Sequence, residues 1–268
     1  VQTVSREGVS LDEALENIDI GGPTLIRAAA KNFPSVIVVV DPADYQPVLE
    51  RLRAGDIDQD ERKRLAQKAF QHVAVYDTAI SQYLGQGMEA FPEEMTIALK
   101  KRYSLRYGEN PHQQAAFYAE LVARGGRDTG ITWAKQLGGK ELSFNNLLDF
   151  QAALNIVSEL TQPAVAVIKH NNPCGAAEGK TLKEACQKAF QGDHVSAFGS
   201  IVGLNRLVDK ETASIITSNG NFVEGIIAPD YSQEALTILK ERKSWGKKLI
   251  ILKGELKKEE NFKMDIKK

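Results

Sequence analysis

Cysteine is almost absent from this chain: Cys174 and Cys186 are the only two among 268 residues. Two cysteines cannot build a disulfide framework, and these lack the CxxC spacing of a zinc site. No apolar run approaches the ~20 residues that a membrane-spanning helix needs, and no signal-peptide pattern opens the sequence. We therefore expect a cytoplasmic protein of a reducing compartment, without a membrane partner.

An excess of charge of one sign is also missing. The 34 Lys and Arg residues balance 35 Asp and Glu residues, which leaves a formal net charge of −1. A general nucleic-acid or membrane-surface binder needs a basic excess, so no nucleic-acid partner is expected. With 43% hydrophobic and 26% charged residues, the composition is that of a globular protein, long enough for one large domain or two ordinary ones.

Helical and strand-like segments alternate along the chain, which is typical of an α/β fold. The β-branched run SVIVVV at 35–40 predicts a fully buried strand. A capping box starts a short helix at Ser10, and the apolar stripe of a long helix includes His72 as a satisfied core residue. A Gly- and Pro-containing segment at 85–92 is interpreted as a link between two units. The predicted helices are 10–17, 24–32, 43–54, 60–83, 142–160, 181–191, 210–218 and 232–243, and the predicted strands are 35–40, 164–169, 200–204, 222–228 and 248–252.

The first stretch that suits chemistry is Asp19-Ile-Gly-Gly22, which runs into a helix carrying Arg27 and Lys31. A Gly pair lets backbone amides approach a ligand, and a helix N-terminus favours an anion. Arg27 and Lys31 share one helix face and could pair with a phosphate or with Asp19. A plain turn between two helices with solvated charges has the same pattern.

A second polar stretch, 105–113, crowds hydrogen-bonding side chains, Arg106 and Tyr107 among them, around Gly108 and Pro111. Such side chains on a stiff loop suit ligand recognition. A capped surface turn would have the same composition.

The sharpest pattern is a buried strand that delivers Lys169 and His170 into a loop at 171–175. Because ligands on α/β sheets gather at the carboxyl ends of strands, we expect a site there. Histidine is the usual proton carrier near neutral pH, and an adjacent lysine can stabilise developing negative charge. The alternative is a solvated lysine beside a histidine that merely ends the strand. Cys174 lacks a thiol-enzyme signature and is interpreted as a small buried residue.

A fourth stretch, Ser196 to Gly199, precedes a predicted strand. Its small residues allow close backbone approach to a flat ligand, and Phe198 could stack on one, although packed strand starts often look alike. His194 is expected to be exposed. The four histidines show no metal-like spacing with carboxylates, so no metal site is predicted.

Five segments carry a resemblance to one family, in the family's order and at similar spacing. They are IDIGGPTLIRAAAKN at 18–32, LRYGENPHQ at 105–113, IKHNNPCG at 168–175, SAFGSIVGLNR at 196–206 and EGIIAP at 224–229. Together they resemble the bifunctional purine-biosynthesis family that combines AICAR transformylase with IMP cyclohydrolase. Each motif is modest alone, whereas five in order over nearly the whole chain are highly specific.

The resemblance implies both a fold and an activity. Residues 1–98 would be the C-terminal part of a methylglyoxal-synthase-like cyclohydrolase domain, and residues 99–268 the N-terminal part of a transformylase built from cytidine-deaminase-like modules without zinc. The family transfers a formyl group from the cosubstrate 10-formyltetrahydrofolate to AICAR, and then closes formyl-AICAR to IMP with loss of water. Its members are homodimers with the transformylase site built across the interface, so a homodimer is expected.

The family's functional residues carry over position by position. Lys169 and His170 match the catalytic pair of the transformylase, in which the histidine manages the proton of the attacking amine and the lysine stabilises charge. Asp19 and Lys31 match the cyclohydrolase pair. The positions that match substrate-binding residues are Arg106, Tyr107, Asn146, Phe198, Gly199 and Glu224 for AICAR, and Gly21 and Gly22 for the nucleotide-holding turn.

The sequence also departs from the pattern of the family that it resembles. The family has a first phosphate loop and a motif with a catalytic tyrosine before the VQTVSREG stretch, and a second deaminase-like module after 248–252, so both sites are expected to be incomplete here. His194 replaces a common proline, and Glu224 replaces the aspartate of some members, which preserves the acceptor and changes its reach. The alternatives are a catalytically incomplete nucleotide-binding fragment and, less favoured, a methylglyoxal-synthase-like lyase, because Lys169 and His170 would lie outside such a domain.

Overall fold

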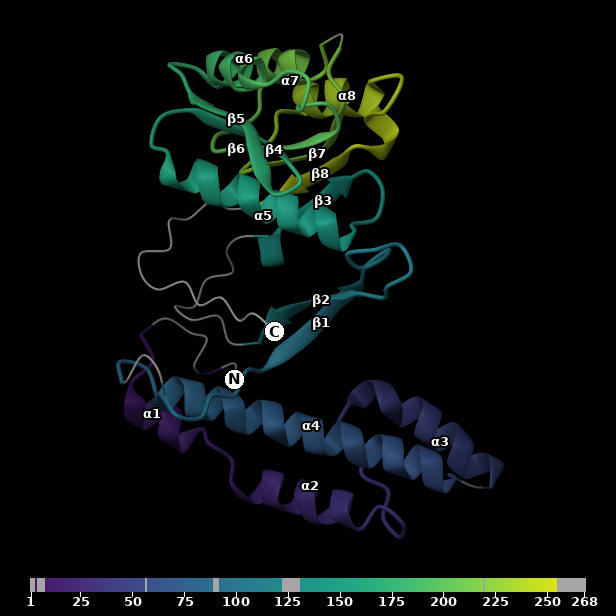
Figure 1. Cartoon of the computed structure of the whole chain (residues 1–268). Helices are drawn as coiled ribbons and strands as arrows, with labels where there is room; N and C mark the ends of the chain where they lie inside the picture. Colours follow the sequence, from purple (N-terminus) through teal and green to yellow (C-terminus); the bar gives the residue numbers. More distant parts are fainter. Residues whose placement is uncertain are drawn as a thin grey trace. The chain divides into compact units, whose positions relative to one another are not determined.

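The computed structural model describes residues 3, 8–55, 57–88, 92–121, 131–218 and 220–254. The chain divides into two compact units, one of residues 1–100 with 119–127 and the other of residues 101–118 with 128–268. The division passes through a two-stranded ribbon, formed in the described part of the chain by β1 (Leu99–Ser104) and β2 (Ala116–Glu120) (Figure 1).

The described residues of the first unit are mainly helical. The helices are α1 (Leu11–Glu16), α2 (Gly21–Lys31), a 3-10 turn (Pro42–Asp44), α3 (Tyr45–Ala54) and α4 (Gln59–Leu84). Side chains cap their starts: the Ser10 hydroxyl accepts from the Glu13 N–H, and the Asp58 carboxylate accepts from the Glu61 N–H. The helices predicted at 10–17, 24–32, 43–54 and 60–83 are therefore confirmed.

The strand predicted at 35–40 is wrong. Residues 36–40 adopt no regular secondary structure and pair with no strand among the described residues. Their side chains still alternate, since Val38 and Val40 pack with residues of α2 and α4, whereas Ile37 and Val39 pack with a second cluster that includes Leu65 of α4. The apolar run correctly predicted that side chains on both faces pack against other residues. A strand, however, also needs a neighbouring strand to hydrogen-bond with.

His72 is exposed on α4, so its prediction as a core residue is also wrong. The buried stripe of this helix runs in four-residue steps through Leu65, Ala69 and Val73. His72 lies on the flank of that stripe, where a polar ring reaches solvent.

A mixed six-stranded sheet forms the centre of the described part of the second unit. Its strands, in spatial order, are β3 (Lys135–Gly138), β8 (Ile250–Lys253), β7 (Val223–Ala228), β6 (Ser200–Leu204), β4 (Ala164–Lys169) and β5 (Asn172–Glu178). Strands β6, β7 and β8 are parallel, whereas β3 is antiparallel to β8, β4 to β6, and β5 to β4. The strands predicted at 164–169, 200–204, 222–228 and 248–252 are confirmed.

Helices cover both faces of this sheet. One face carries α5 (Phe144–Glu159), and the other carries α6 (Leu182–Gly192), α7 (Lys210–Ile216) and α8 (Gln233–Glu241) (Figure 1). Val165 and Val167 of β4 pack on the side of α6 to α8, whereas Ala166 and Ile168 pack on the side of α5. A strand buried on both faces reads as a continuous apolar run, which is why these strands were predictable. All four helices were predicted from the sequence.

None of the described helices is long and apolar enough to cross a bilayer.

Candidate functional site

The strongest candidate site begins at the turn between β4 and β5. Lys169 pairs with Asn172 across the hairpin, which leaves His170 and Asn171 as a two-residue turn. Both turn residues have positive φ, +50° and +64°, as type I′ hairpins require. The loop expected at 171–175 is therefore wrong, because Asn172 already begins β5. His170 is exposed at the tip of a short, well-defined turn.

Lys169 reaches across the sheet rather than into solvent. Its Nζ donates a hydrogen bond to the carbonyl oxygen of Gly199 at 2.9 Å. This meeting depends on strand direction: β4 is antiparallel to β6, so the end of β4 lies beside the beginning of β6. Lys169 thus stands at the carboxyl end of β4, as expected, but the strands beside it, β6 and β7, contribute their amino ends.

Gly199 fits this position because it lacks a side chain. Its φ of +77° is one that L side chains rarely adopt, and a Cβ built on it would lie 2.9 Å from the Lys169 ammonium nitrogen. Its N–H donates to the carbonyl of Phe222 at 2.7 Å, which fixes the segment that enters β6. Lysine and backbone can therefore approach each other closely here.

A short aromatic row lies beside this contact. The rings of Phe198 and Phe222 have centroids 5.1 Å apart, and Phe222 and Trp245 have centroids 6.2 Å apart. Phe198 is 61% exposed, whereas Trp245 is buried. An exposed ring packed on a half-buried one can stack on a flat ligand.

A carboxylate is held in place near the same end of the sheet. Glu224, the second residue of β7, accepts hydrogen bonds on Oε1 from Lys140 Nζ at 2.6 Å and from Asn146 Nδ2 at 3.2 Å. Burial opposes ionisation of Glu224, but these two hydrogen bonds and the charges of Lys140 and Lys169 outweigh it and lower its pKa. Glu224 is therefore an ionised, pre-oriented acceptor at neutral pH.

Asn146 owes its position to the start of α5. Its Oδ1 accepts from the backbone N–H of Ser143, and the Ser143 hydroxyl accepts from the Asn146 N–H, which completes a capping box. The other end of the Asn146 amide is thereby turned toward Glu224.

Arg106 and Tyr107 are attached to the same helix start. The Arg106 N–H donates to Leu142 O at 3.1 Å, and Tyr107 O accepts from the Phe144 N–H at 3.3 Å. The Arg106 guanidinium lies 4.8 Å from the centre of the Tyr107 ring and donates to the Tyr107 hydroxyl. The exposed guanidinium is therefore held against an aromatic ring and keeps donors free for an anion.

Lys140 is a member of this site that the sequence did not suggest. It lies in a polar turn, GGKELS, without a local motif, and its partner Glu224 is 84 positions away along the chain. No signal in a single sequence could have paired them.

In the first unit, the structure separates the residues predicted to act together. Asp19 precedes α2, where its Oδ1 accepts from the Gly22 N–H at 3.0 Å, whereas Lys31 is the last residue of α2. The ten steps from the first to the last residue of α2, at ~1.5 Å per residue, span roughly 15 Å along the helix axis, so Asp19 and Lys31 lie toward opposite ends of this helix. Gly21 is exposed, and Gly22 has no room for a side chain because a Cβ there would collide with the Asp19 carboxylate.

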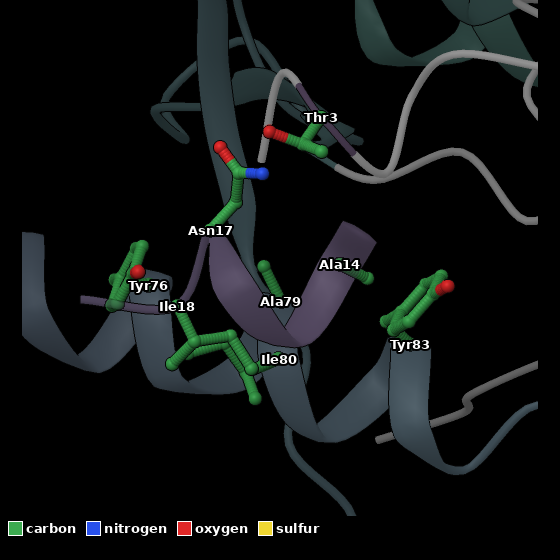
Figure 2. A pocket seen from close by; sticks show the side chains of 8 residues that line it. All are labelled: Thr3, Ala14, Asn17, Ile18, Tyr76, Ala79, Ile80 and Tyr83. Carbon is green, nitrogen blue, oxygen red and sulfur yellow. The ribbon is translucent and has the colours of Figure 1, made fainter. Parts of the chain in front are cut away.

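A small cavity of about 30 Å³ lies between α1 and α4 (Figure 2). Its lining is mostly apolar, and one wall is Tyr76, whose hydroxyl accepts from the Asp19 N–H at 2.8 Å. This volume admits about one water molecule, so the cavity cannot hold a nucleotide.

The surroundings of Cys174 and His194 show how each side chain is placed. Cys174 is half-buried, and burial raises the pKa of its thiol, with Asp193 adding and Lys169 opposing. A thiol that stays protonated is a poor nucleophile. His194 is exposed, as predicted. Among the described residues, no group of three or more His, Cys, Asp or Glu side chains could hold a metal ion.

The fold and the site define a class of protein: a mixed α/β chain that gathers an ammonium, an imidazole, a carboxylate and an exposed aromatic ring at one end of its larger sheet. Comparison with known families then matches residues 29–268 to the family described as "AICARFT/IMPCHase bienzyme". The chain belongs to this family.

Curated relatives agree with the family match. The "Bifunctional purine biosynthesis protein PurH" of Bacillus subtilis (strain 168) is 49% identical over 245 residues, which are 91% of this chain and 47% of the relative. The proteins of the same name from Lysinibacillus sphaericus (strain C3-41) and Rhodopirellula baltica (strain DSM 10527 / NCIMB 13988 / SH1) are each 48% identical, over 98% and 91% of this chain and over 50% and 46% of the relative. The chain thus spans about half the length of the curated relatives it matches.

Proposed function

We propose that this chain serves the last two steps of purine biosynthesis. In the first step, the amine of AICAR takes a formyl group from 10-formyltetrahydrofolate and gives formyl-AICAR; in the second, formyl-AICAR closes to IMP with loss of water. The observation that carries the first step is the hydrogen bond from Lys169 to Gly199 beside the exposed His170. The names of the relatives support the pathway.

Each residue near this contact has a task in formyl transfer. The amine nitrogen of AICAR forms a bond to the formyl carbon while the bond from that carbon to N10 of folate breaks. His170 takes the proton that the amine loses, and N10 takes up a proton as it leaves. Lys169 stabilises the negative charge that develops on the formyl oxygen. No metal takes part in these steps.

The substrate-binding roles follow the chemistry of the side chains. Arg106 binds the phosphate of AICAR with its guanidinium, and Tyr107 supports that guanidinium. Phe198 stacks on the flat base, with the backbone of Gly199 approaching from the same segment. Glu224 and Asn146 offer a fixed acceptor and a fixed amide to the carboxamide and amine of the base.

The same proposal assigns folds, partners and the second activity. Residues 1–98 form part of a methylglyoxal-synthase-like cyclohydrolase domain, with Asp19, Lys31, Gly21 and Gly22 in its site. Residues 99–268 form part of a cytidine-deaminase-like transformylase, and the protein acts in the cytoplasm as a homodimer.

The test is a formyl-transfer assay on this chain with AICAR and 10-formyltetrahydrofolate, with AICAR binding followed by calorimetry. In a version of the chain extended to the length of its relatives, we expect His170→Ala to abolish formyl transfer and leave cyclisation of added formyl-AICAR intact, whereas Lys31→Ala should abolish cyclisation. Lys183→Ala is the control, because Lys183 lies on α6, where its ammonium pairs with the exposed Glu211.

The outcomes of this test distinguish an active enzyme from a catalytically incomplete nucleotide-binding fragment. Turnover that requires His170 supports the enzyme. AICAR binding without turnover, lost in a Lys169→Ala/His170→Ala double variant, supports the second candidate, a catalytically incomplete nucleotide-binding fragment. A chain that neither binds nor converts AICAR contradicts both, and an unchanged cyclisation rate in Lys31→Ala contradicts the role of Lys31.

A further inference from the structure

The turn that presents His170 adopts a backbone conformation that L side chains disfavour. His170 and Asn171 are the two non-glycine residues with positive φ in the described part of the chain. Neither has the conformational freedom of glycine, and histidine at such a position is uncommon. Contacts that favour this conformation therefore stabilise the turn.

Two polar side chains hydrogen-bond to the backbone of the turn. The Asp149 carboxylate of α5 accepts a hydrogen bond from the Asn171 N–H, with 2.6 Å between nitrogen and Oδ1. The Asn172 amide donates to the His170 carbonyl at 2.9 Å. Asn172 belongs to the hairpin itself, whereas Asp149 ties the hairpin to the helix on one face of the sheet.

We propose that Asp149 is a positioning residue for His170, through the backbone of the turn. The proposal rests on the proposed transformylase function, in which His170 takes the proton of the amine. A charged acceptor makes one of the stronger hydrogen bonds available to a backbone N–H. It favours the turn conformation that exposes His170 next to Lys169 along the chain.

The electrostatic surroundings agree with this position. Half-burial raises the pKa of Asp149, while the hydrogen bond from Asn171 and the charges of His170 and Lys169 lower it, and Glu224 raises it; the net shift is upward. Both residues of the predicted catalytic pair, His170 and Lys169, therefore act electrostatically on the Asp149 carboxylate. Its carboxylate accepts the hydrogen bond from the Asn171 N–H of the turn.

The experiment uses an isotope-labelled chain and four variants. In the parent chain, the Asn171 amide resonance should shift with pH as Asp149 titrates, above the ordinary value of 3.8. Asp149→Asn keeps an acceptor oxygen and should abolish that titration while binding AICAR within about threefold of the parent. Asp149→Ala removes the acceptor and should weaken AICAR binding by about tenfold or more.

Two further variants separate positioning from stability. Asn171→Gly, combined with Asp149→Ala, should restore most of the AICAR binding, because glycine adopts positive φ without help. Val157→Ala, fully buried on the same helix, should lower stability and leave AICAR binding unchanged.

Three results would overturn the role of Asp149: an Asn171 amide that ignores pH in the parent, unchanged binding in Asp149→Ala, or equal loss of binding in Val157→Ala. A parent chain that binds no AICAR would instead overturn the proposed function, and the amide titration alone would then decide what Asp149 does to the turn.

Discussion

At the scale of single residues, the close approach of Lys169 to Gly199 sets the most demanding condition. The lysine needs a partner carbonyl within reach, and the backbone there has a φ of +77° with no room for a side chain. The roles proposed for Lys169 and Gly199 thus depend on residue 199 having no Cβ.

Replacing Gly199 with alanine should therefore damage both stability and binding. A left-handed conformation costs an L residue about 1–2 kcal/mol, and the added Cβ would displace the Lys169 ammonium. We expect a lower free energy of unfolding in urea and AICAR binding weakened by about tenfold, measured by calorimetry.

Gly87→Ala is the matched control. Gly87 has almost the same φ, +78°, but nothing lies within 4 Å of a Cβ there. It should lose a similar amount of stability and keep AICAR binding. Equal binding loss in both variants would show that the space beside Lys169 is irrelevant.

The ion pair between Lys140 and Glu224 predicts a dependence of stability on pH. The pKa of Glu224 is lower in the folded chain than its ordinary value of 4.5, although burial opposes this. Ionised Glu224 therefore stabilises the fold above that value, and the contribution is lost as pH falls through the lowered pKa.

Lys140→Met should remove the main source of this effect. We expect a loss of roughly 1 kcal/mol at neutral pH, discounted for partial exposure, which shrinks as the pH falls below the ordinary value for Glu224. Urea unfolding at several pH values measures it. Lys183→Met, which removes an exposed ion pair to Glu211, should change stability by less than about 0.5 kcal/mol at every pH. A constant loss across pH in Lys140→Met would contradict the assignment.

At the scale of elements, α5 organises much of the second unit's site. Its first turn carries Asn146, which orients Glu224, and its N-terminal backbone holds the segment with Arg106 and Tyr107. One turn further along, Asp149 reaches the hairpin between β4 and β5. A single helix start thus connects residues from four separate parts of the sequence.

Ser143→Ala tests this organisation, because it removes one half of the capping box. Loss of a cap costs about 1 kcal/mol, and here it should also release Asn146 and weaken AICAR binding. Thr181→Ala removes an equivalent cap from α6, where the Thr181 hydroxyl accepts from the Glu184 N–H. Unfolding in urea should show similar losses of stability in the two variants, while calorimetry should show weaker binding in Ser143→Ala alone. A binding loss in Thr181→Ala as well would indicate a general effect of destabilisation.

The elements also show which sequence signals were reliable. Strands β4, β6, β7 and β8 were predicted because helices bury both of their faces, so that apolar residues run without interruption. Strands β1, β2, β3 and β5 were missed because Ala119 is the one buried residue among them, so no apolar run marks them. The run at 36–40 carried the signal of a buried strand but has no strand partner among the described residues. A run of apolar residues indicates burial, whereas a strand also requires hydrogen bonds to a neighbouring strand.

At the scale of the whole molecule, local sequence determined the helices and the buried strands, because periodicity and caps act within a few residues. It also carried the motifs that led to the family and to Lys169 and His170. Tertiary structure decided the direction of β4 against β6, and with it the meeting of Lys169 and Gly199. It also brought Lys140 to Glu224 and Asp149 to Asn171. Such contacts join positions far apart along the chain, so no local pattern encodes them, and only the packing of helix on sheet brings them together.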